Sequence, residues 1–407
     1  MTWQILVGEW SDFAIRWLHV IAAVAWIGSS FYFIHLDLSL QKRAGLPEGV
    51  AGEAWQVHGG GFYNMQKYVV APSHMPEDLT WFKWEAYMTF LSGFALLCVH
   101  YWANPELYLI DKTVLDLVPW QAVTLGVLTL ALGWVVYDQL CKSPLGKNDV
   151  ALFGVLYVYL VFIAWGMTHV FSGRGAFIEF GALIGTMMVA NVAMIIIPKQ
   201  RIVVKSLLAG EEPDPALGKA GKQRSLHNNY LTLPVVFLMI SNHYPLSFGT
   251  QYNWLIIALV MIMGVAIRHF FNSQHAHKGN PWWTWLVAAA CFVLIAWLSG
   301  FGPSAAKAAE SKPGTAQAQK IKFADVQEIV VSRCSMCHAQ EPVWSGVGVA
   351  PKGVMLETPD EIHLHAKQIY LQAVMSHAMP PGGNITEIAP EDRRILGLWF
   401  EQGASMN

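Results

Sequence analysis

Apolar side chains in this chain are grouped in long runs that are separated by short polar segments. The runs fall near 11–33, 80–102, 118–138, 150–169, 176–197, 229–246, 252–272 and 283–301. A run of about 20 apolar residues is long enough to cross a bilayer as an α-helix. No basic stretch precedes the first run, which indicates an uncleaved first span. The pattern predicts an all-α fold in which residues 1–301 form an eight-span transmembrane helix bundle.

The composition agrees with lipid as the solvent. Hydrophobic residues make up 54% of the chain and charged residues 13%, whereas soluble proteins average about 25% charged residues. The net charge of −2 argues against a nucleic-acid partner, which favours a basic surface. Cys98, Cys141 and Cys291 are scattered in or beside apolar runs, and we expect them to be small buried side chains.

Lysine and arginine are distributed unequally between the two sets of loops. Thirteen of them lie in the loops that follow the odd-numbered runs or at the end of the run beside such a loop, and two lie in the loops that follow the even-numbered runs. Cytoplasmic loops carry the excess of basic residues, so both termini are predicted to lie outside the cytoplasm. The thirteen are Lys42, Arg43, Lys67, Lys142, Lys147, Lys199, Arg201, Lys205, Lys219, Lys222, Arg224, Arg268 and Lys278, and the two are Lys112 and Arg174.

The C-terminal part of the chain has a different character. Residues 302–320 are small and polar with two prolines, as in a flexible linker. Residues 321–407 then form a soluble module that contains Cys334, Cys337 and His338 as C-x-x-C-H. This spacing is the attachment sequence of a c-type haem. The two thiols form thioethers and the histidine is an iron ligand, so we expect one covalent haem c and a periplasmic cytochrome c domain at a bacterial inner membrane.

The iron of such a haem takes a sixth ligand, and a thioether in that position raises the reduction potential. We select Met379, because it stands in "HAMPPGG" beside two prolines and two glycines that stiffen the loop. It also follows His338 at a distance that suits a small cytochrome. The other candidates are Met355, Met375, His363, His365 and His377.

Four histidines are predicted to lie in the outer half of the bundle. His19 is in the first run, and His100, His169 and His243 are near the ends of the second, fourth and sixth. Ionisable groups in lipid are costly and usually functional. Histidines from two helices could bind a non-covalent haem b. The alternative is that each one only hydrogen-bonds a neighbouring helix.

A second polar cluster is predicted on the cytoplasmic side. Residues 55–87 are too polar to span but rich in aromatic side chains, with three consecutive glycines that allow a close approach to the backbone. This segment could bind a planar polar molecule, or it could be an interfacial segment that anchors the second span. The candidate residues are His58, Tyr63, Lys67, Lys83 and Glu85.

Three stretches of the chain are familiar. "RWLHVIAAVAWIGSSFYF", "HGGGFYNMQKYVVAP" and "WFKWEAYMTFLSGF", with the later runs and the "CSMCH" module, resemble the bacterial membrane-bound urate oxidase (urate hydroxylase) family over essentially the whole chain. The first stretch also resembles membrane proteins whose first-span histidine binds haem b. The resemblance implies oxidation of urate to 5-hydroxyisourate, with electrons passed to the chain's own cytochrome c domain rather than to oxygen. The only functional residues that the resemblance assigns in this chain are the haem residues Cys334, Cys337, His338 and Met379.

The resemblance and the residues together lead to a specific expectation. Urate binds near the cytoplasmic cluster, and electrons pass through a haem b and the haem c to a soluble cytochrome c or a terminal oxidase. In a competing arrangement, Arg16 and Arg174 hold urate from outside and no haem b is present. No G-x-G-x-x-G follows a predicted strand, which argues against a Rossmann-bound cofactor. Two other functions stay open: a quinol-oxidising electron relay, and a metal-binding membrane protein fused to a cytochrome c.

Overall fold

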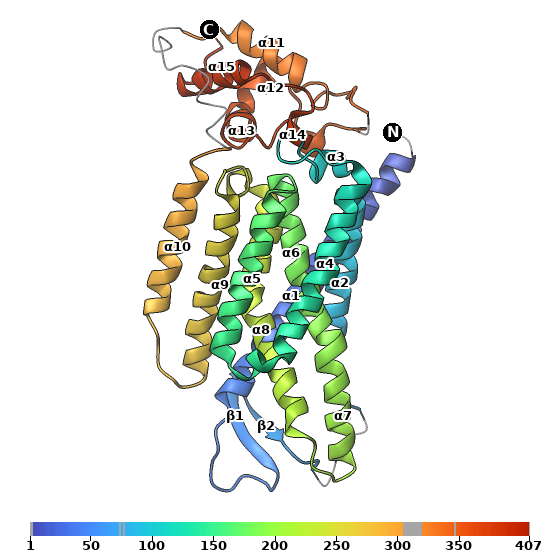
Figure 1. The fold of residues 1–407 in the computed structure, drawn as a ribbon, viewed down its shortest axis with the longest axis vertical. Helices are drawn as coiled ribbons and strands as arrows, with labels where there is room; N and C mark the ends of the chain where they lie inside the picture. The colour runs from blue at the N-terminus through green and yellow to red at the C-terminus, as the bar shows by residue number, and fades with distance from the viewer. Residues whose placement is uncertain (1–2, 73–74, 76–77, 304–319, 346, 407) are drawn as a thin grey trace.

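The computed structural model describes residues 3–72, 75, 78–303, 320–345 and 347–406. The chain is mostly helical and forms a long bundle with a smaller helical domain at one end (Figure 1). The expected linker, 302–320, lies almost entirely outside the described residues. Figure 1 places the N-terminus and the C-terminal domain at the same end of the bundle, as an even number of crossings requires.

A helix occupies each of the eight apolar runs. The bundle helices are α1 (Trp3–Ser39), α2 (Trp84–Leu96) with its π-helical continuation η1 (Leu97–Trp102), α4 (Pro119–Lys142), α5 (Asp149–Thr168), α6 (Gly173–Ala190) continued by η3 (Asn191–Ile196) and α7 (Ile197–Leu208), α8 (Pro215–Ile240), α9 (Asn253–His275) and α10 (Trp283–Ser299). Shorter turns are α3 (Pro105–Tyr108), η2 (Pro144–Lys147), η4 (Ser241–His243) and η5 (Pro245–Ser247).

Five of the described helices are long and apolar enough to cross a membrane. They are Leu6–Ser39, Pro119–Lys142, Asp149–Thr168, Gly173–Leu208 and Asn253–His275. The α10 helix has 17 residues and α2 has 13 before it changes to a π-helix, so both fall short in length. The α8 helix begins with a polar half. The protein is therefore a membrane-type helical bundle, and the number of eight spans stays a prediction.

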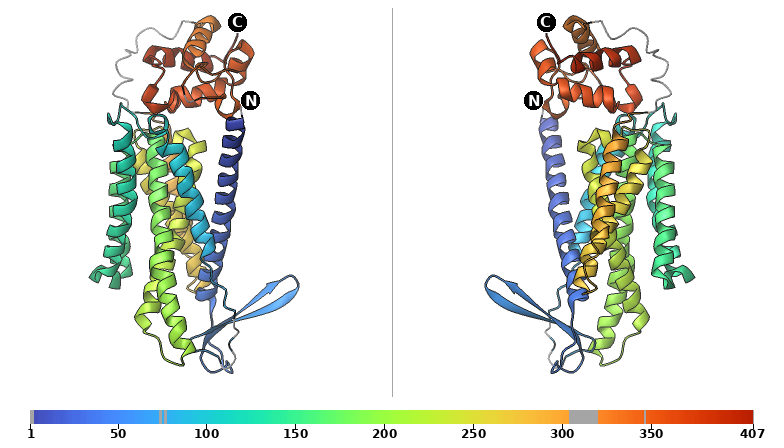
Figure 2. Two further views of the ribbon diagram at one scale, coloured as in Figure 1. Left: turned by 90° about the vertical axis from the view of Figure 1, so that its right-hand side faces the viewer. Right: turned by 90° about the vertical axis from the view of Figure 1, so that its left-hand side faces the viewer.

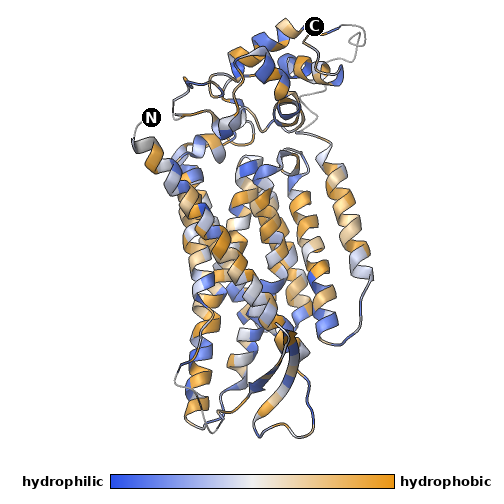
Figure 3. Cartoon of the chain, turned by 180° about the vertical axis from the view of Figure 1, so that it is seen from behind, coloured by the Kyte–Doolittle hydropathy of each residue, from blue (hydrophilic) through white to orange (hydrophobic). Residues whose placement is uncertain are grey.

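The α6 helix lies at the centre of the bundle. Phe177, Phe180 and Leu183 on this helix are fully buried, and α6 packs against α4, α5 and α8. The pairs α1–α2, α8–α9 and α9–α10 complete the bundle (Figure 2). Large apolar side chains such as Trp17 and Val24 on α1 stay exposed, and apolar residues cover the lengths of the helices while polar ones gather at the ends (Figure 3). This is the surface that lipid requires.

The helix starts follow from local sequence. The side chain of Asn148 accepts a hydrogen bond from the backbone N–H of Ala151 at 3.1 Å and starts α5. Ser172 starts α6 in the same way, accepting from Gly175 at 3.0 Å. Such caps satisfy backbone donors that the first turn leaves without partners. The α5 and α6 helices therefore each begin at a polar capping residue.

The prediction of an all-α fold is wrong in one place. Residues Val50–His58 (β1) and Gly61–Tyr68 (β2) form an antiparallel hairpin, which projects from the end of the bundle opposite the C-terminal domain (Figure 2). Gly59 and Gly60 connect the strands with φ of 58° and 81°, the left-handed conformations of a tight hairpin turn. No described atom lies within 4 Å of a Cβ placed at either residue. These two glycines shape the turn.

The C-terminal domain has a core of its own. Val326, Ile362, Leu396 and Trp399 are buried together in it. Its elements are α11 (Phe323–Arg333), η7 (Pro351–Gly353), α12 (Pro359–Leu364), α13 (Ala366–Ile369), the π-helix η8 (Tyr370–Met375), α14 (Pro381–Asn384) and α15 (Pro390–Glu401).

A buried ion pair joins α4 to α8. The guanidinium of Arg224 donates to the Asp138 carboxylate at 2.8 Å, and both side chains are almost fully buried. Arg224 also donates to the side-chain oxygen of Asn191 at 3.1 Å, and Asn191 donates to Asn228 at 3.0 Å. The second carboxylate oxygen of Asp138 accepts from Lys142 at 2.5 Å. The assignment of Arg224 to a loop is thus wrong, because α8 begins at Pro215 and takes this arginine into the bundle.

Replacement of Asp138 by leucine should lower the free energy of unfolding by about 3–5 kcal/mol, because it leaves the charge of Arg224 unpaired in the apolar interior. The double variant Asp138→Leu/Arg224→Met should recover most of this loss, since neither buried charge remains. Thermal unfolding of the purified protein in detergent measures both variants. Equal losses in the single and double variants would contradict this role of the ion pair.

Candidate functional sites

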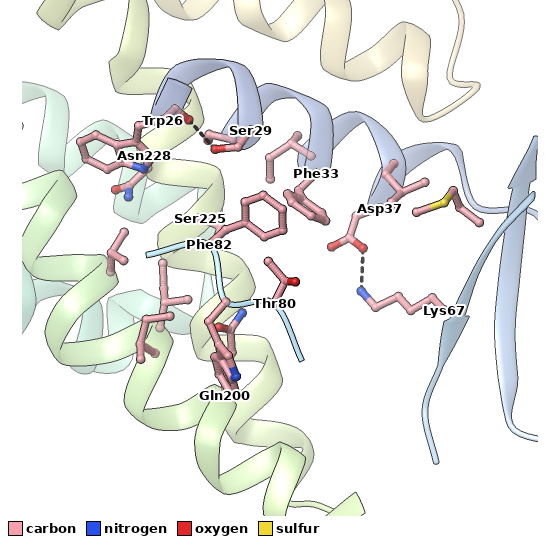
Figure 4. Close-up of a pocket in the computed structure, with 18 of the residues that line it drawn as sticks. Trp26, Ser29, Phe33, Asp37, Lys67, Thr80, Phe82, Gln200, Ser225 and Asn228 are labelled. Atoms are coloured by element: carbon pink, nitrogen blue, oxygen red, sulfur yellow. Dashed lines mark hydrogen bonds and ion pairs between the residues drawn. The ribbon is translucent and has the colours of Figure 1, made fainter. Parts of the chain in front are cut away.

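A cavity of about 550 Å³ lies near the end of the bundle that carries the hairpin (Figure 4). This volume is in the usual range for a small-molecule site. Side chains from α1, β2, the segment before α2, the η3–α7 region and α8 form its walls. The lining residues are Trp26, Ser29, Ser30, Phe33, Ile34, Leu36, Asp37, Leu40, Met65, Gln66, Lys67, Thr80, Trp81, Phe82, Val192, Ile196, Ile197, Gln200, Ser225 and Asn228.

One wall of the cavity is charged. The Lys67 ammonium on β2 donates to the Asp37 carboxylate on α1 at 2.6 Å, and this pair is drawn in Figure 4. Both side chains are partly exposed, at 51% for Lys67 and 35% for Asp37. A pair this exposed contributes little to stability, so both groups can exchange their mutual contact for one with a ligand.

The opposite walls combine amides, a hydroxyl and aromatic rings. Gln200 extends from α7, and Ser225 and Asn228 lie three residues apart on α8 (Figure 4). The rings of Phe33 and Phe82 meet with their centroids 4.8 Å apart. Aromatic faces pack against flat ligands and amides hydrogen-bond their edges. The cavity therefore offers aromatic faces and amide groups to a planar, polar molecule, beside a neutralised pair of charges.

Of the five residues predicted on this side, the structure places only Lys67 in the lining of the cavity. His58 and Tyr63 are exposed on the hairpin, and Lys83 lies over the ring of Trp84 at 5.6 Å. Glu85 is in the first turn of α2. The structure thus does not bring the five together.

The sequence interpretation missed Asp37, Gln200, Ser225 and Asn228. Ser225 and Asn228 share a helical face, but hydropathy assigned this region to a loop. The spacing of three between two small polar residues, followed by a long apolar run, is the signal that could have found them.

His19 on α1 faces α2. Its Nδ1 donates to the carbonyl of Thr89 at 3.0 Å and lies 3.2 Å from the Ser92 hydroxyl. A Cβ on Gly93 would lie 2.7 Å from the His19 ring, so the glycine makes room for it. A ring that donates through Nδ1 keeps the lone pair of Nε2 available, which is the tautomer of a metal-binding histidine.

The other three outer histidines have separate surroundings. Nε2 of His100 contacts both Arg16, at 2.7 Å, and Asp12. Nδ1 of His169 donates to the carbonyl of Trp165 at 2.7 Å, and His243 is exposed in η4. Within the described part of the chain, no hydrogen bond or ring contact joins any of them to His19.

Two alternatives from the sequence can be compared with the structure: a urate site formed by Arg16 and Arg174, and a metal site. Arg174 lies over the ring of Phe248 at 5.6 Å and shares no contact with Arg16 among the described residues. Over the same residues, no group of three or more His, Cys, Asp or Glu side chains is arranged to hold a metal ion.

The Cys334–His338 segment begins where α11 ends. Neither Cys334 nor Cys337 is in a disulfide, and the backbone N–H of His338 donates to the carbonyl of Cys334 at 2.9 Å. Nδ1 of His338 donates to the carbonyl of Val354 at 2.9 Å, which leaves Nε2 as the free nitrogen. Burial lowers the pKa of His338 and raises the pKa of Cys334 to about 12. Two unbridged thiols and a neutral, oriented imidazole fit the requirements of a covalently bound haem.

The backbone around Met379 is fixed from within the C-terminal domain. The N–H of Met379 donates to the carbonyl of Gln372 at 3.0 Å, and the Met379 carbonyl accepts from Arg393 at 3.0 Å. Arg393 is itself buried and also donates to the carbonyl of Ala373. The alternative ligand His363 donates through Nδ1 to the carbonyl of Ala404 at 3.0 Å, which leaves its Nε2 free as in His338.

Comparison with known proteins identifies the bundle. The profile of the family described as "Urate oxidase N-terminal" matches residues 5–299, which is the whole bundle from α1 to α10. Neither the curated proteins nor the solved structures contain a significant match. The matched region is most of the chain, so the chain belongs to the urate oxidase N-terminal family.

Proposed function

We propose that the protein is a membrane oxidoreductase that converts urate to 5-hydroxyisourate and passes the electrons to a c-type haem on its own C-terminal domain. The proposal rests mainly on one combination: a bundle of the urate oxidase family continues, in the same chain, into a domain where Nδ1 of His338 is fixed beside two unbridged cysteines. A covalently bound haem supplies an acceptor for one electron at a time.

The inner cavity is the proposed substrate site. Urate at neutral pH is a flat anion with several N–H donors and carbonyl acceptors. Lys67 would attract the negative charge, while Gln200 and Asn228 would bond the edges of the ring. Phe33 and Phe82 offer faces for the purine. Asp37, released from Lys67, is placed to accept an N–H proton from urate.

The balance of the reaction explains why an electron acceptor is needed. Urate and water give 5-hydroxyisourate, two protons and two electrons. The residues of the cavity bind and orient the purine and take up a proton, and no side chain among them can keep the electrons. Since haem c accepts one electron at a time, a second acceptor in the bundle would store the other electron.

His19 is the proposed ligand of that second acceptor, a haem b. It lies on α1 seven residues before Trp26 of the cavity wall, or about 10 Å along the helix. Its second ligand would come from His100, His169 or His243. The C-terminal domain would lie in the periplasm at the bacterial inner membrane and deliver electrons to a soluble cytochrome c or a terminal oxidase.

The purified full-length protein should show its haem absorption bands reduced when urate is added under nitrogen, and quinol should not substitute for urate. Mass spectrometry of the denatured chain should find one haem attached, and Cys334→Ser/Cys337→Ser should lose it, because no thioether can then form. Reduction by quinol alone would favour the respiratory relay. A chain without covalent haem would contradict the proposal altogether.

Replacement of Lys67 by methionine should lower kcat/KM for urate about tenfold, which corresponds to the loss of about 1.4 kcal/mol from one charge-assisted contact. The effect should fall mainly on KM, since the charge acts on the bound anion. Lys42→Met, an exposed lysine that does not line the cavity, is the control. Equal kinetics for the two variants would move the substrate site away from the cavity.

A pyridine haemochrome assay should find non-covalent haem b in addition to haem c, and His19→Ala should remove the b-type signal while the covalent haem stays. Of His100→Ala, His169→Ala and His243→Ala, the variant that also loses it identifies the second ligand. A wild-type protein with haem c alone would overturn this electron route and leave the substrate proposal to be judged by the reduction experiment.

A further inference from the structure

The C-terminal domain rests on the bundle through the loop that carries Met379. Figure 1 shows α14, which follows Met379 directly, beside α3 at the end of the bundle. Ser376 and Pro380 are buried, and Ala378 packs against the core of the bundle itself. The contact is therefore made by the residues on both sides of the proposed haem ligand.

Three glycines show how closely the two domains approach. A Cβ on Gly249, between η5 and α9, would lie 2.5 Å from both the Cβ and the carbonyl oxygen of Ser376. A Cβ on Gly382 would lie 2.4 Å from the backbone oxygen of Glu106 on α3. On Gly383 it would lie 2.3 Å from the Asp111 carboxylate. Real Cβ atoms do not approach other atoms this closely, so the interface has no room for a methyl group at any of the three positions.

The partners of these glycines are held firmly. The same carboxylate oxygen of Asp111 accepts from the backbone N–H of Thr113 at 2.9 Å and from its hydroxyl at 2.6 Å. Glu106 is met at its backbone oxygen, and Ser376 at its carbonyl oxygen, Cα and Cβ, none of which can turn away as the end of a long side chain could. On its other side, the loop is held by Arg393 through the carbonyl of Met379. The loop is thus fixed between Arg393 and the bundle.

We propose that the bundle is a positioning element for the sixth haem ligand: the packing of residues 376–383 against Glu106, Asp111 and Gly249 keeps the Met379 thioether on the iron and thereby sets the reduction potential. This inference rests on the proposed haem c. It assigns to Gly249, Gly382 and Gly383 a role that the urate-binding function does not require.

The physical reason lies in the nature of the ligand. A thioether is a neutral and weak ligand, whose bond to iron depends on the loop that holds it, and ligand identity and surroundings tune the potential. His338 is fixed by its own hydrogen bond and would also be held by thioethers at Cys334 and Cys337 once a haem is attached. Met379 is covalently independent of the haem, so displacement of its loop would release it first.

Gly249→Ala tests the proposal from the bundle side, since it changes no residue of the C-terminal domain. In the full-length protein it should retain the covalent haem but lose the long-wavelength absorption band of methionine-ligated ferric haem. Its ferrous haem should bind carbon monoxide, and its reduction potential should fall. Gly383→Ala should give the same three changes from the other side of the interface.

Matched glycines serve as controls. Gly166 on α5 has no described atom within 4 Å of a built Cβ, and neither has Gly403 of the C-terminal domain, whose φ of 92° is positive like the 71° at Gly383. Gly166→Ala and Gly403→Ala should leave the band, the potential and the lack of carbon monoxide binding unchanged. If the interface variants keep intact methionine ligation, or if Gly403→Ala disturbs it equally, the positioning role is refuted. A wild-type chain without covalent haem would instead refute the proposed function.

Discussion

The main constraint on the interior of the bundle is that the buried charges of Asp138 and Arg224 must stay paired. Two charges in an apolar interior are tolerated only when they are paired and their remaining hydrogen-bonding capacity is used, and here Asn191 and Lys142 complete the set. The network includes Asn228, which forms part of the cavity wall and also donates to the carbonyl of Met188 at 2.9 Å. The geometry of the cavity is therefore linked to the polar contacts that join α4, η3, α6 and α8.

The cavity and the C-x-x-C-H segment lie at opposite ends of the bundle. The cavity with Lys67 and Asp37 lies at the end of the bundle that carries the hairpin, and the Cys334–His338 segment lies beyond the opposite end (Figure 1). His19 and His338 each donate through Nδ1 to a backbone carbonyl and keep Nε2 free, as do His169 and His363. Of these four, His19 within the bundle and His338 in the C-terminal domain are the ligands of the proposed stepwise path for electrons.

Hydropathy alone located the eight apolar runs, and among the described residues each run contains a helix, five of which are long and apolar enough to cross a membrane. It failed where polar residues are buried and satisfy one another. Arg224 and Asn228 looked like loop residues, although α8 encloses them. The hairpin was missed because its glycines fit both a turn and a ligand contact. Of the residues that line the cavity, the sequence predicted only Lys67. Asp37, Gln200 and Asn228 come from distant parts of the sequence, and no local pattern indicates that they line the same cavity.

The continuous helix Gly173–Leu208 has 36 residues, which is about 54 Å at 1.5 Å per residue, far more than a hydrocarbon core of about 30 Å. Gln200, which contributes to the cavity, lies about 40 Å along this helix, beyond the span of such a core, so urate would not have to cross lipid to reach the proposed site. In the proposed function only the electrons would cross. In the proposed orientation they move from the negative to the positive side of the membrane, and each 100 mV of membrane voltage adds about 2.3 kcal/mol per electron to the driving force.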